Sequence, residues 1–482
     1  MNKVVPEGNQ APAITEANTS NARQVLSKTE SVCPVCLARI PAARVARGEN
    51  IYLQKTCPKH GDFEAVIWRG RPDFATWVHY KIASYPDRPF TQVEKGCPFD
   101  CGLCPNHRQH SCHVLLELTS RCDLGCPICF ADAGASTGGY RVPDPSLGQI
   151  ERWYQRLLEA GGPFNIQLSG GEPCLRDDLP EIIALGRALG FQFFQLNTNG
   201  LRLAQDNNYL QRLIAAGLST VFLQFDGTED AIYEKLRGRR LLPQKQAAIE
   251  QCASAGVGVV LVPTLVPGVN TDNIGHILRF ALRYAPMVRG VHFQPVSYFG
   301  RYPHPPADSD RFTIPEVIRA IEAQMQGTIQ SDCFAPSSCE NALCSFHGNF
   351  VLMPDGQLKP LTRRKDETRC CCSPTVAKEG AVKSRAFVAR QWSAPAAKPE
   401  PPSANSPSLG EWDVFLARAQ THAFCISGMA FQDVWTLDLE RLRDCCIHTA
   451  SPDARLIPFC AYNLTDQCGH SLYRQTLGQP TT

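Results

Sequence analysis

The 482-residue chain lacks both kinds of segment that direct proteins to or across a membrane. No run of about 18 apolar residues, the length needed to span a bilayer, occurs in it. Its first residues, MNKVVPEGNQAPAITEANTSNARQ, are polar and lack the apolar stretch of a secretory signal peptide. The formal net charge is only +2, so there is no basic excess for nucleic acid. We expect a cytoplasmic protein with no transmembrane segment and no nucleic-acid partner.

Cysteine, in contrast, is abundant, with 23 copies. In a short secreted protein this number would indicate disulfides, but this chain is long and shows no export signal. Thiolate ligation of metals in a reducing compartment is therefore the better interpretation. Hydrophobic residues make up 43% of the chain, which is enough for one large catalytic domain with appended modules.

The first seventy residues predict a small metal module behind a disordered start. Residues 1–30 are polar and aperiodic, and we expect them to be disordered. In residues 31–70, Cys33 and Cys36 form one ligand pair, and Cys57 and His60 form a second about twenty residues later. Two such pairs on tight turns are typical of a zinc-ribbon or rubredoxin-like site. The metal is zinc or iron, and His60 favours zinc. The alternative is two structural turns that happen to carry cysteine.

One cysteine spacing then occurs twice in a short stretch. The first copy is Cys97, Cys101 and Cys104, within a linker at 71–112, and the second copy is Cys122, Cys126 and Cys129. Three thiolates at this spacing suit an iron–sulfur cluster that keeps one iron free of cysteine. Such an iron can bind a substrate or a cofactor, so one of the two copies is a candidate reactive centre.

Residues 113–300 alternate between apolar strands and amphipathic helices, which predicts parallel βα units. The strands are expected at 113–119, 164–168, 191–197, 219–225, 257–265 and 290–296. The helices are expected near 146–160, 179–189, 207–216, 244–255 and 272–285. Periodicity alone does not distinguish a doubly wound sheet from part of a barrel.

The position of the two cysteine triplets indicates which one reacts. The second triplet follows the strand 113–119 directly, and parallel α/β sheets bind ligands at this end of their strands. The first triplet follows an aperiodic stretch with no strand before it. We therefore assign the reactive cluster to Cys122, Cys126 and Cys129. Phe130 follows the last of these ligands and is placed to shield the cluster or to pack against an adenine.

The remainder of the chain is less regular. In an extension at 301–390, we expect a helix near 314–326 and a hairpin turn at Pro354–Gly356. This extension ends in a charged stretch that contains Cys370–Cys372. Residues 391–410 are rich in Pro, Ala and Ser and predict a flexible linker or insertion. Residues 411–482 regain order and form a second cysteine-rich region.

The second triplet, an aromatic residue after it, and Ser169-Gly170-Gly171-Glu172-Pro173 after the next strand resemble the radical S-adenosylmethionine (SAM) superfamily. The resemblance covers roughly residues 112–300 and implies a partial (β/α)6 TIM-like barrel. It also implies a [4Fe–4S] cluster on Cys122, Cys126 and Cys129 that binds SAM and cleaves it reductively to a 5′-deoxyadenosyl radical. Gly170, Gly171 and Glu172 resemble the segment that binds the methionine amino group, with glycines that allow close approach and a carboxylate for the ammonium.

Further polar residues at predicted strand ends are candidates for contact with SAM or substrate. Ordinary turn chemistry is an equal alternative for each of them. These residues are Asn197 and Asn199 after the third strand, Gln224 and Asp226 at the fourth, and Gln294 at the sixth.

The order of motifs across residues 31–468 resembles a branch with several clusters. This branch contains the class D radical SAM methyltransferases that act on pterins, and the archaeal tetraether lipid synthases look similar. The resemblance implies one or two auxiliary [4Fe–4S] clusters. One would use Cys97, Cys101 and Cys104, with Cys112 or a distant cysteine as the fourth ligand. The candidates for another are Cys339, Cys344, Cys445, Cys446 and Cys460.

The function implied is carbon–carbon bond formation. The favoured reaction is C-methylation of a pterin-like or other small molecule, and the alternative is coupling of lipid tails. The methylation would need a one-carbon donor such as a methylene-folate, and the lipid reaction would involve peripheral contact with a membrane. Either reaction needs a reduced electron donor of the flavodoxin or ferredoxin type. A non-catalytic metal-binding or redox-sensing protein is the remaining alternative, but it leaves the ordered strand-end motifs unexplained.

Overall fold

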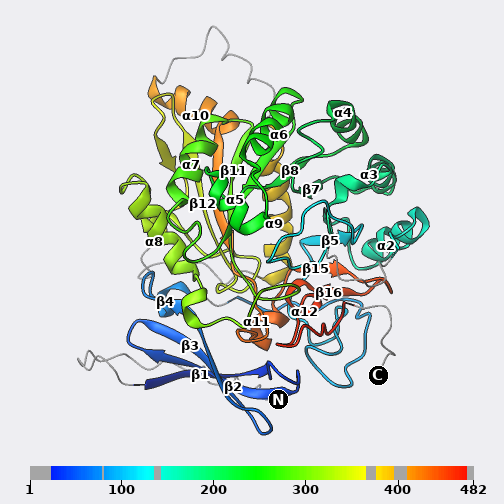
Figure 1. Cartoon of the computed structure of the whole chain (residues 1–482), viewed down its shortest axis with the longest axis vertical. Coiled ribbons are helices and arrows are strands. Elements are labelled where there is room, and N and C mark those ends of the chain that lie inside the picture. The colour runs from blue at the N-terminus through cyan, green and yellow to red at the C-terminus, as the bar shows by residue number, and fades with distance from the viewer. Residues whose placement is uncertain (1–22, 79–80, 135–142, 365–375, 396–409, 475–482) are drawn as a thin grey trace, which may run out of the picture.

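The computed structural model describes residues 23–78, 81–134, 143–364, 376–395 and 410–474 (Figure 1). Three predicted features lie wholly or mostly outside these ranges. They are the disordered start, the Cys370–Cys372 run and the linker 391–410.

The N-terminal module is a four-stranded antiparallel sheet in the order β1-β2-β3-β4. Its strands are β1 (Arg23–Val32), β2 (Arg39–Arg47), β3 (Asn50–Cys57) and β4 (Gly61–Arg69). The expectation of disorder through residue 30 is therefore wrong for residues 23–30. The polar sequence hid this strand because its first part is exposed, while its backbone pairs along the length of β2.

All six strands predicted for the core are present and lie side by side in parallel. They are β5 (His113–Glu117), β6 (Asn165–Ser169), β7 (Phe194–Thr198), β8 (Thr220–Gln224), β9 (Gly258–Val262) and β11 (Val288–Pro295). The predicted strand 257–265 is interrupted at Pro263: β9 pairs with both β8 and β11, whereas β10 (Thr264–Leu265), after the proline, pairs with β11.

The predicted helices are also present, with one addition. They are α2 (Leu147–Glu159), α3 (Leu179–Ala188), α4 (Asn207–Ala216), α6 (Leu242–Ser254), α7 (Ile274–Arg283) and α8 (Ile314–Gln324). Helix α5 (Asp230–Arg237) was not predicted, because it is only eight residues long. A short α1 (Phe74–Trp77) follows the N-terminal sheet. Single 3-10 turns lie at Pro173–Leu175, Asp308–Asp310 and Ser331–Cys333.

The C-terminal third of the chain extends the same sheet at both edges. Strand β14 (Ala423–Met429) pairs in parallel with β11, and β15 (Ile447–Ala450) pairs in parallel with β5. The sheet order is β13-β12-β14-β11-β9-β8-β7-β6-β5-β15-β16, so the partial barrel ends at antiparallel strands on each side. The other C-terminal elements are β12 (Ser345–Leu352), β13 (Leu358–Pro360), α9 (Ala377–Trp392), α10 (Glu411–Thr421), α11 (Leu439–Arg443), β16 (Leu456–Pro458) and α12 (Phe459–Tyr462). Antiparallel pairing of β12 with β13 confirms the predicted hairpin.

The two faces of the parallel sheet have different partners. Alternate residues such as Val221 and Leu223 belong to the main core beneath the outer helices, of which α2, α3 and α4 lie on the right in Figure 1. The residues between them point the other way. Phe222 and Val260 pack with Val388 and Trp392 of α9. Helix α9 therefore lies against the inner face of the partial barrel.

The N-terminal module is fixed to the C-terminal segment 434–440 by buried polar contacts. The Thr29 hydroxyl donates to Asp438 at 2.8 Å, and Arg44 donates to the same carboxylate at 2.8 Å. Lys55, which is 3% exposed, donates from Nζ to the carbonyl of Val434 at 2.6 Å. These contacts place the blue sheet directly below α11 in Figure 1.

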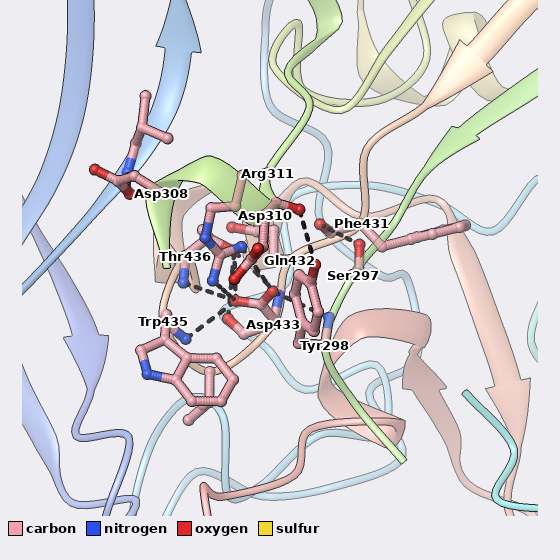
Figure 2. Close-up of polar contacts among 12 residues, drawn as sticks. Ser297, Tyr298, Asp308, Asp310, Arg311, Phe431, Gln432, Asp433, Trp435 and Thr436 are labelled. Atoms are coloured by element: carbon pink, nitrogen blue, oxygen red, sulfur yellow. Dashed lines mark hydrogen bonds and ion pairs between the residues drawn. The ribbon is translucent and has the colours of Figure 1, made fainter. Parts of the chain in front are cut away.

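Next to this junction, a buried carboxylate connects the barrel to the same segment (Figure 2). Asp433 pairs with Arg311 at 2.8 and 3.2 Å and accepts a hydrogen bond from the Tyr298 amide at 3.1 Å. Trp435 and Thr436 also donate their amides to it, both at 3.2 Å. Burial alone would raise the pKa of Asp433, but the Arg311 charge and these donors lower it.

We expect Asp433→Ala to destabilise the protein by about 3–5 kcal/mol, because it leaves Arg311 buried without its counter-charge. The measurement is the shift in denaturant midpoint followed by tryptophan fluorescence. Because the pKa of Asp433 is lowered on folding, its contribution is lost as pH falls through that pKa. The double variant Asp433→Leu with Arg311→Met serves as the control and is expected to cost less than the single change. If the single variant lay within about 0.5 kcal/mol of wild type, the usual range of surface substitutions, this account would be refuted.

Within the described residues, no helix is long and apolar enough to cross a membrane.

Candidate functional site

The second cysteine triplet lies on the loop that leaves β5. Cys122, Cys126 and Cys129 all line one cavity with a volume of about 550 Å³. The loop is held by Arg301, which exchanges two backbone hydrogen bonds of 2.9 Å with Cys129. The Arg301 side chain also donates to the carbonyl of Cys126 at 2.9 Å. The three thiols are therefore presented to the cavity by a loop with defined partners.

The two glycines after β6 allow that strand to approach the cysteine loop closely. The amide of Gly171 donates to the carbonyl of Thr119 at 2.7 Å, and that of Glu172 donates to Arg121 at 2.8 Å. A Cβ at Gly171 would lie 2.1 Å from the Arg121 oxygen, so no other residue fits without moving the backbone. The Gly-Gly-Glu segment thus fixes the loop that begins the triplet.

Glu172 holds neighbouring strand ends together. Its carboxylate accepts from the Thr198 hydroxyl and the Asn199 amide, both at 2.7 Å, and from the Cys174 amide at 2.9 Å. Burial raises the pKa of Glu172, although these donors oppose the shift. Asn199 in turn donates from its side chain to Asp123, next to Cys122, at 2.6 Å. Three donors of the protein therefore use the carboxylate, which has about four acceptor sites, so its predicted contact with an ammonium stays a prediction.

Most of the residues expected at strand ends line this cavity. They are Phe130, Gly170, Gly171, Glu172, Asn197, Asn199, Gln224 and Gln294. The exception is Asp226, which is fully buried and does not line the cavity. Asp226 instead binds Arg237, whose side chain does reach the cavity.

Two cationic side chains at this site were not predicted from the sequence. Arg237 ends the unpredicted helix α5, and Lys245 lies inside α6, where a lysine ordinarily indicates an exposed face. Lys245 is fully buried and donates to the carbonyl of Asn199 at 2.5 Å and to Gln224 at 2.7 Å. Burial lowers the pKa of Lys245 to about 8. No periodicity signals such a buried lysine.

Aromatic side chains form one wall of the cavity. Phe130 packs against Phe459 with ring centroids 5.6 Å apart, and Phe459 packs against Phe431 at 4.4 Å. At the other end, Phe222 and Trp392 pack at 4.6 Å, and Phe387 of α9 also lines the cavity. The cavity is thus polar at the strand ends and has an apolar surface at Phe222, Phe387 and Trp392, beside the polar Lys383 and Ser384 of α9.

The predicted ligands of the N-terminal module come together. The ligand atoms of Cys33, Cys36, Cys57 and His60 all lie within 4.8 Å of one another. His60 Nδ1 lies 3.5 Å from Cys33 Sγ and 3.4 Å from Cys57 Sγ, which are distances that suit ligands of one tetrahedral ion. Burial opposes ionisation of Cys57, but the Lys59 amide and the other hydrogen bonds lower its pKa to about 6. This donor set fits zinc.

The other cysteines assemble into groups that sequence could not pair. Cys112 and Cys446 immediately precede the paired strands β5 and β15, and their Sγ atoms lie within 4.8 Å of each other and of Cys339. Cys112, which was one candidate for the fourth ligand of the first triplet, therefore lies with Cys339 and Cys446. Cys339 and Cys446 were expected in one set with Cys344, but Cys344 is not part of their group. Cys344 lies near Cys445 and Cys460 instead, around the buried Arg441.

The first triplet also forms one site. Cys97, Cys101 and Cys104 line a small cavity together with Arg443. Every cysteine in the described part of the chain is a free thiol, so all of these groups are available to metals. The residues present therefore fit a reactive cluster and auxiliary clusters.

Two family models match the chain. Residues 25–69 match the N-terminal zinc ribbon domain described as HMPTM, and residues 116–281 match the radical SAM superfamily. The first match covers the four-stranded sheet with its Cys3His group. The second begins in β5 and ends in α7, and thus includes Cys122, Cys126 and Cys129 of the large cavity.

Known relatives extend the similarity to nearly the whole chain. The 7,8-dihydro-6-hydroxymethylpterin dimethyltransferase of Methanocaldococcus jannaschii is 37% identical over 90% of this chain and 93% of that protein. The probable GTP 3′,8-cyclase of Methanococcus aeolicus is 23% identical over 54% of this chain and 88% of that one. The solved structure of methylornithine synthase (PylB) covers 58% of this chain and 82% of its own, at 15% identity and a TM-score of 0.38.

Proposed function

Because the chain belongs to the radical SAM superfamily, in the family of the M. jannaschii 7,8-dihydro-6-hydroxymethylpterin dimethyltransferase, we propose that it C-methylates a pterin-like small molecule. The observation that carries this proposal is the 37% identity, which spans 90% of the chain and 93% of the relative. The polar strand ends and the aromatic wall of that cavity suit a flat heterocycle with hydrogen-bonding edges.

In this proposal Cys122, Cys126 and Cys129 would hold the [4Fe–4S] cluster, and the same cavity would hold SAM. When bound, the cluster and SAM supply a 5′-deoxyadenosyl radical for hydrogen abstraction. Asn197, Asn199, Gln224 and Gln294 provide donors and acceptors for SAM or the substrate, since all of them line the cavity.

The protein itself orients these groups and keeps water away. Gly170 and Gly171 bring the end of β6 against the cysteine loop, and Glu172 fixes Asn199 next to it. Phe130 and Phe459 close the cavity on one side with a surface that excludes water. The Lys245 ammonium holds the backbone of Asn199 and the side chain of Gln224 in one arrangement.

The other thiol groups fit auxiliary clusters that store or relay electrons. Cys97, Cys101 and Cys104 form one candidate site, and the group of Cys112, Cys339 and Cys446 forms another that borders the large cavity. Cys344, Cys445 and Cys460 are candidates for the remaining ligands. Cys33, Cys36, Cys57 and His60 of the N-terminal sheet would hold zinc. We further propose a cytoplasmic reaction that takes its electrons from a reduced flavodoxin or ferredoxin.

The test is product analysis with anaerobically reconstituted protein. Given SAM, dithionite, 7,8-dihydro-6-hydroxymethylpterin and a methylene-folate donor, the protein is expected to release 5′-deoxyadenosine and a methylated pterin detectable by mass spectrometry. If 5′-deoxyadenosine were released with no change in the pterin, the proposed substrate would be wrong, but the proposed radical chemistry would be supported. If no 5′-deoxyadenosine were released under any condition, the proposal that the protein is a radical SAM enzyme would be wrong.

The apolar end of the cavity favours a second candidate, the radical coupling of lipid tails. Phe222, Phe387 and Trp392 give that end the surface that an alkyl chain requires. The same assay with a dialkyl ether lipid in place of the pterin tests it, with mass analysis for a carbon–carbon linked product. A Phe387→Gln variant is expected to impair lipid coupling but not pterin methylation, because Phe387 lies on α9 and not on the strand ends or the loop of Cys122, Cys126 and Cys129.

A further inference from the structure

A buried ion pair lies next to the middle thiol of the triplet. Arg237 binds Asp226 through two hydrogen bonds of 2.7 Å, from Nε and from Nη2. The side chain of Arg237 is 10% exposed and that of Asp226 is 0% exposed. Removing two charges from water costs several kcal/mol per ion by general estimates, and a well-packed apolar pair often stabilises a core equally well. Fold stability alone therefore gives little reason for a charged pair here.

The guanidinium is aimed from this pair toward the thiol. Asp226 and Thr264 engage only Nε and Nη2, and Arg237 lines the same cavity as Cys126. Besides Asp226, the side chain of Arg237 also interacts with Cys126. Because a guanidinium keeps its proton in proteins, Arg237 is a fixed cation beside the Cys126 sulfur.

Asp226 holds this cation in one position. The carboxylate also accepts from the Thr264 amide at 3.2 Å, and the Asn270 side chain donates to its backbone carbonyl at 2.9 Å. Asp226 itself does not reach the cavity. The cation thus faces the thiols, and its counter-charge lies behind it.

We propose that the Arg237–Asp226 pair sets the reduction potential of the iron–sulfur cluster on Cys122, Cys126 and Cys129, an inference that rests on the proposed function. Reduction adds one negative charge to the cluster. A fixed cation in a site of low dielectric favours the reduced form, and a carboxylate opposes it. Arg237 is a positioning and tuning residue in this account, because it acts on the cluster through the Cys126 thiolate.

The two partners are expected to shift the potential in opposite directions. At a fixed solution potential, Arg237→Gln should lower the ratio of reduced to oxidised cluster about tenfold, which is 59 mV for a one-electron couple. Asp226→Asn, which leaves the cation without its counter-charge, should raise the same ratio. A residue that only supports the fold would not give shifts of opposite sign.

The measurement is an anaerobic redox titration of the complete reconstituted protein without SAM, followed by electron paramagnetic resonance. The signal of this cluster is identified as the one that changes when SAM is added and that is missing in Cys126→Ala. The double variant Asp226→Asn with Arg237→Gln replaces the ion pair by a neutral, hydrogen-bonded pair. It therefore allows the proposal to be tested even if Arg237→Gln alone does not fold. Its potential should lie between those of the single variants. Arg239→Gln removes an exposed cation two residues away and should leave the potential unchanged.

Shifts of the same sign in both single variants, or a potential in Arg237→Gln equal to that of wild type, would overturn the inference. An unchanged potential together with weaker SAM binding would instead make Arg237 a ligand of SAM. A wild-type protein with no SAM-responsive signal would contradict the proposed function itself, so the two failures are distinguishable.

Discussion

We expect Cys126→Ala to abolish the reductive cleavage of SAM to 5′-deoxyadenosine. Cys126 is the middle cysteine of the only triplet in the described residues that follows a strand of the parallel sheet, and it lines the large cavity. Without it, a cluster at this loop keeps two cysteine ligands and loses the geometry that leaves one iron open. The measurement is 5′-deoxyadenosine by chromatography after incubation with SAM and dithionite, and the expected signal equals that of protein-free controls.

The matched variant is Cys101→Ala, in the triplet with the same spacing. Cys101 lines a separate small cavity, so this variant should retain a measurable part of basal SAM cleavage. Iron content and circular dichroism establish that both variants are folded and carry their remaining clusters. Equal and complete loss in two folded variants would refute the assignment of different roles to the two triplets.

The sequence was sufficient for the barrel because each of its strands is a short apolar run, and each strand after the first follows a helix of period 3.6. It also predicted the place of Cys122, Cys126 and Cys129, since their loop follows β5 directly and local order decides the position. The Gly-Gly-Glu segment was placed correctly, but its close contact with Thr119 and Arg121 depends on two neighbouring strands and is visible only in the fold.

The remaining features depend on contacts between distant segments. Cys112 meets Cys446 because β15, more than three hundred residues later, pairs with β5. Lys245 was hidden because a lysine in an amphipathic helix usually faces water, whereas here its ammonium reaches the backbone of Asn199. Asp226 was predicted to contact cofactor because it follows a strand, but its carboxylate turns to Arg237 instead. In each case the partner is set by tertiary packing, which spacing does not encode.

The second large effect is expected from removing the zinc ligand Cys57. Structural zinc contributes about 10–16 kcal/mol to the folding of zinc-finger peptides, so the four-stranded sheet should open when its site loses one thiolate. We expect Cys57→Ser to carry one equivalent less zinc. Amide hydrogen exchange in β3 and β4 should be at least about a thousandfold faster, which corresponds to about 4 kcal/mol. Mass spectrometry of exchanged peptides and metal analysis provide the measurement.

Opening of this sheet should also reach the barrel, because Thr29, Arg44 and Lys55 anchor the segment 434–440, which follows directly after Asp433. Faster exchange is therefore expected around Asp433 and α11, while the outer helices α3 and α4, which the sheet does not contact, should exchange as in wild type. Cys468→Ser removes an exposed thiol that belongs to none of the metal groups and serves as the control. If Cys57→Ser lost zinc but kept wild-type exchange in β3 and β4, the metal would not hold this sheet together. If exchange rose in the sheet but not around Asp433, the contacts of Thr29, Arg44 and Lys55 would not transmit stability to the barrel.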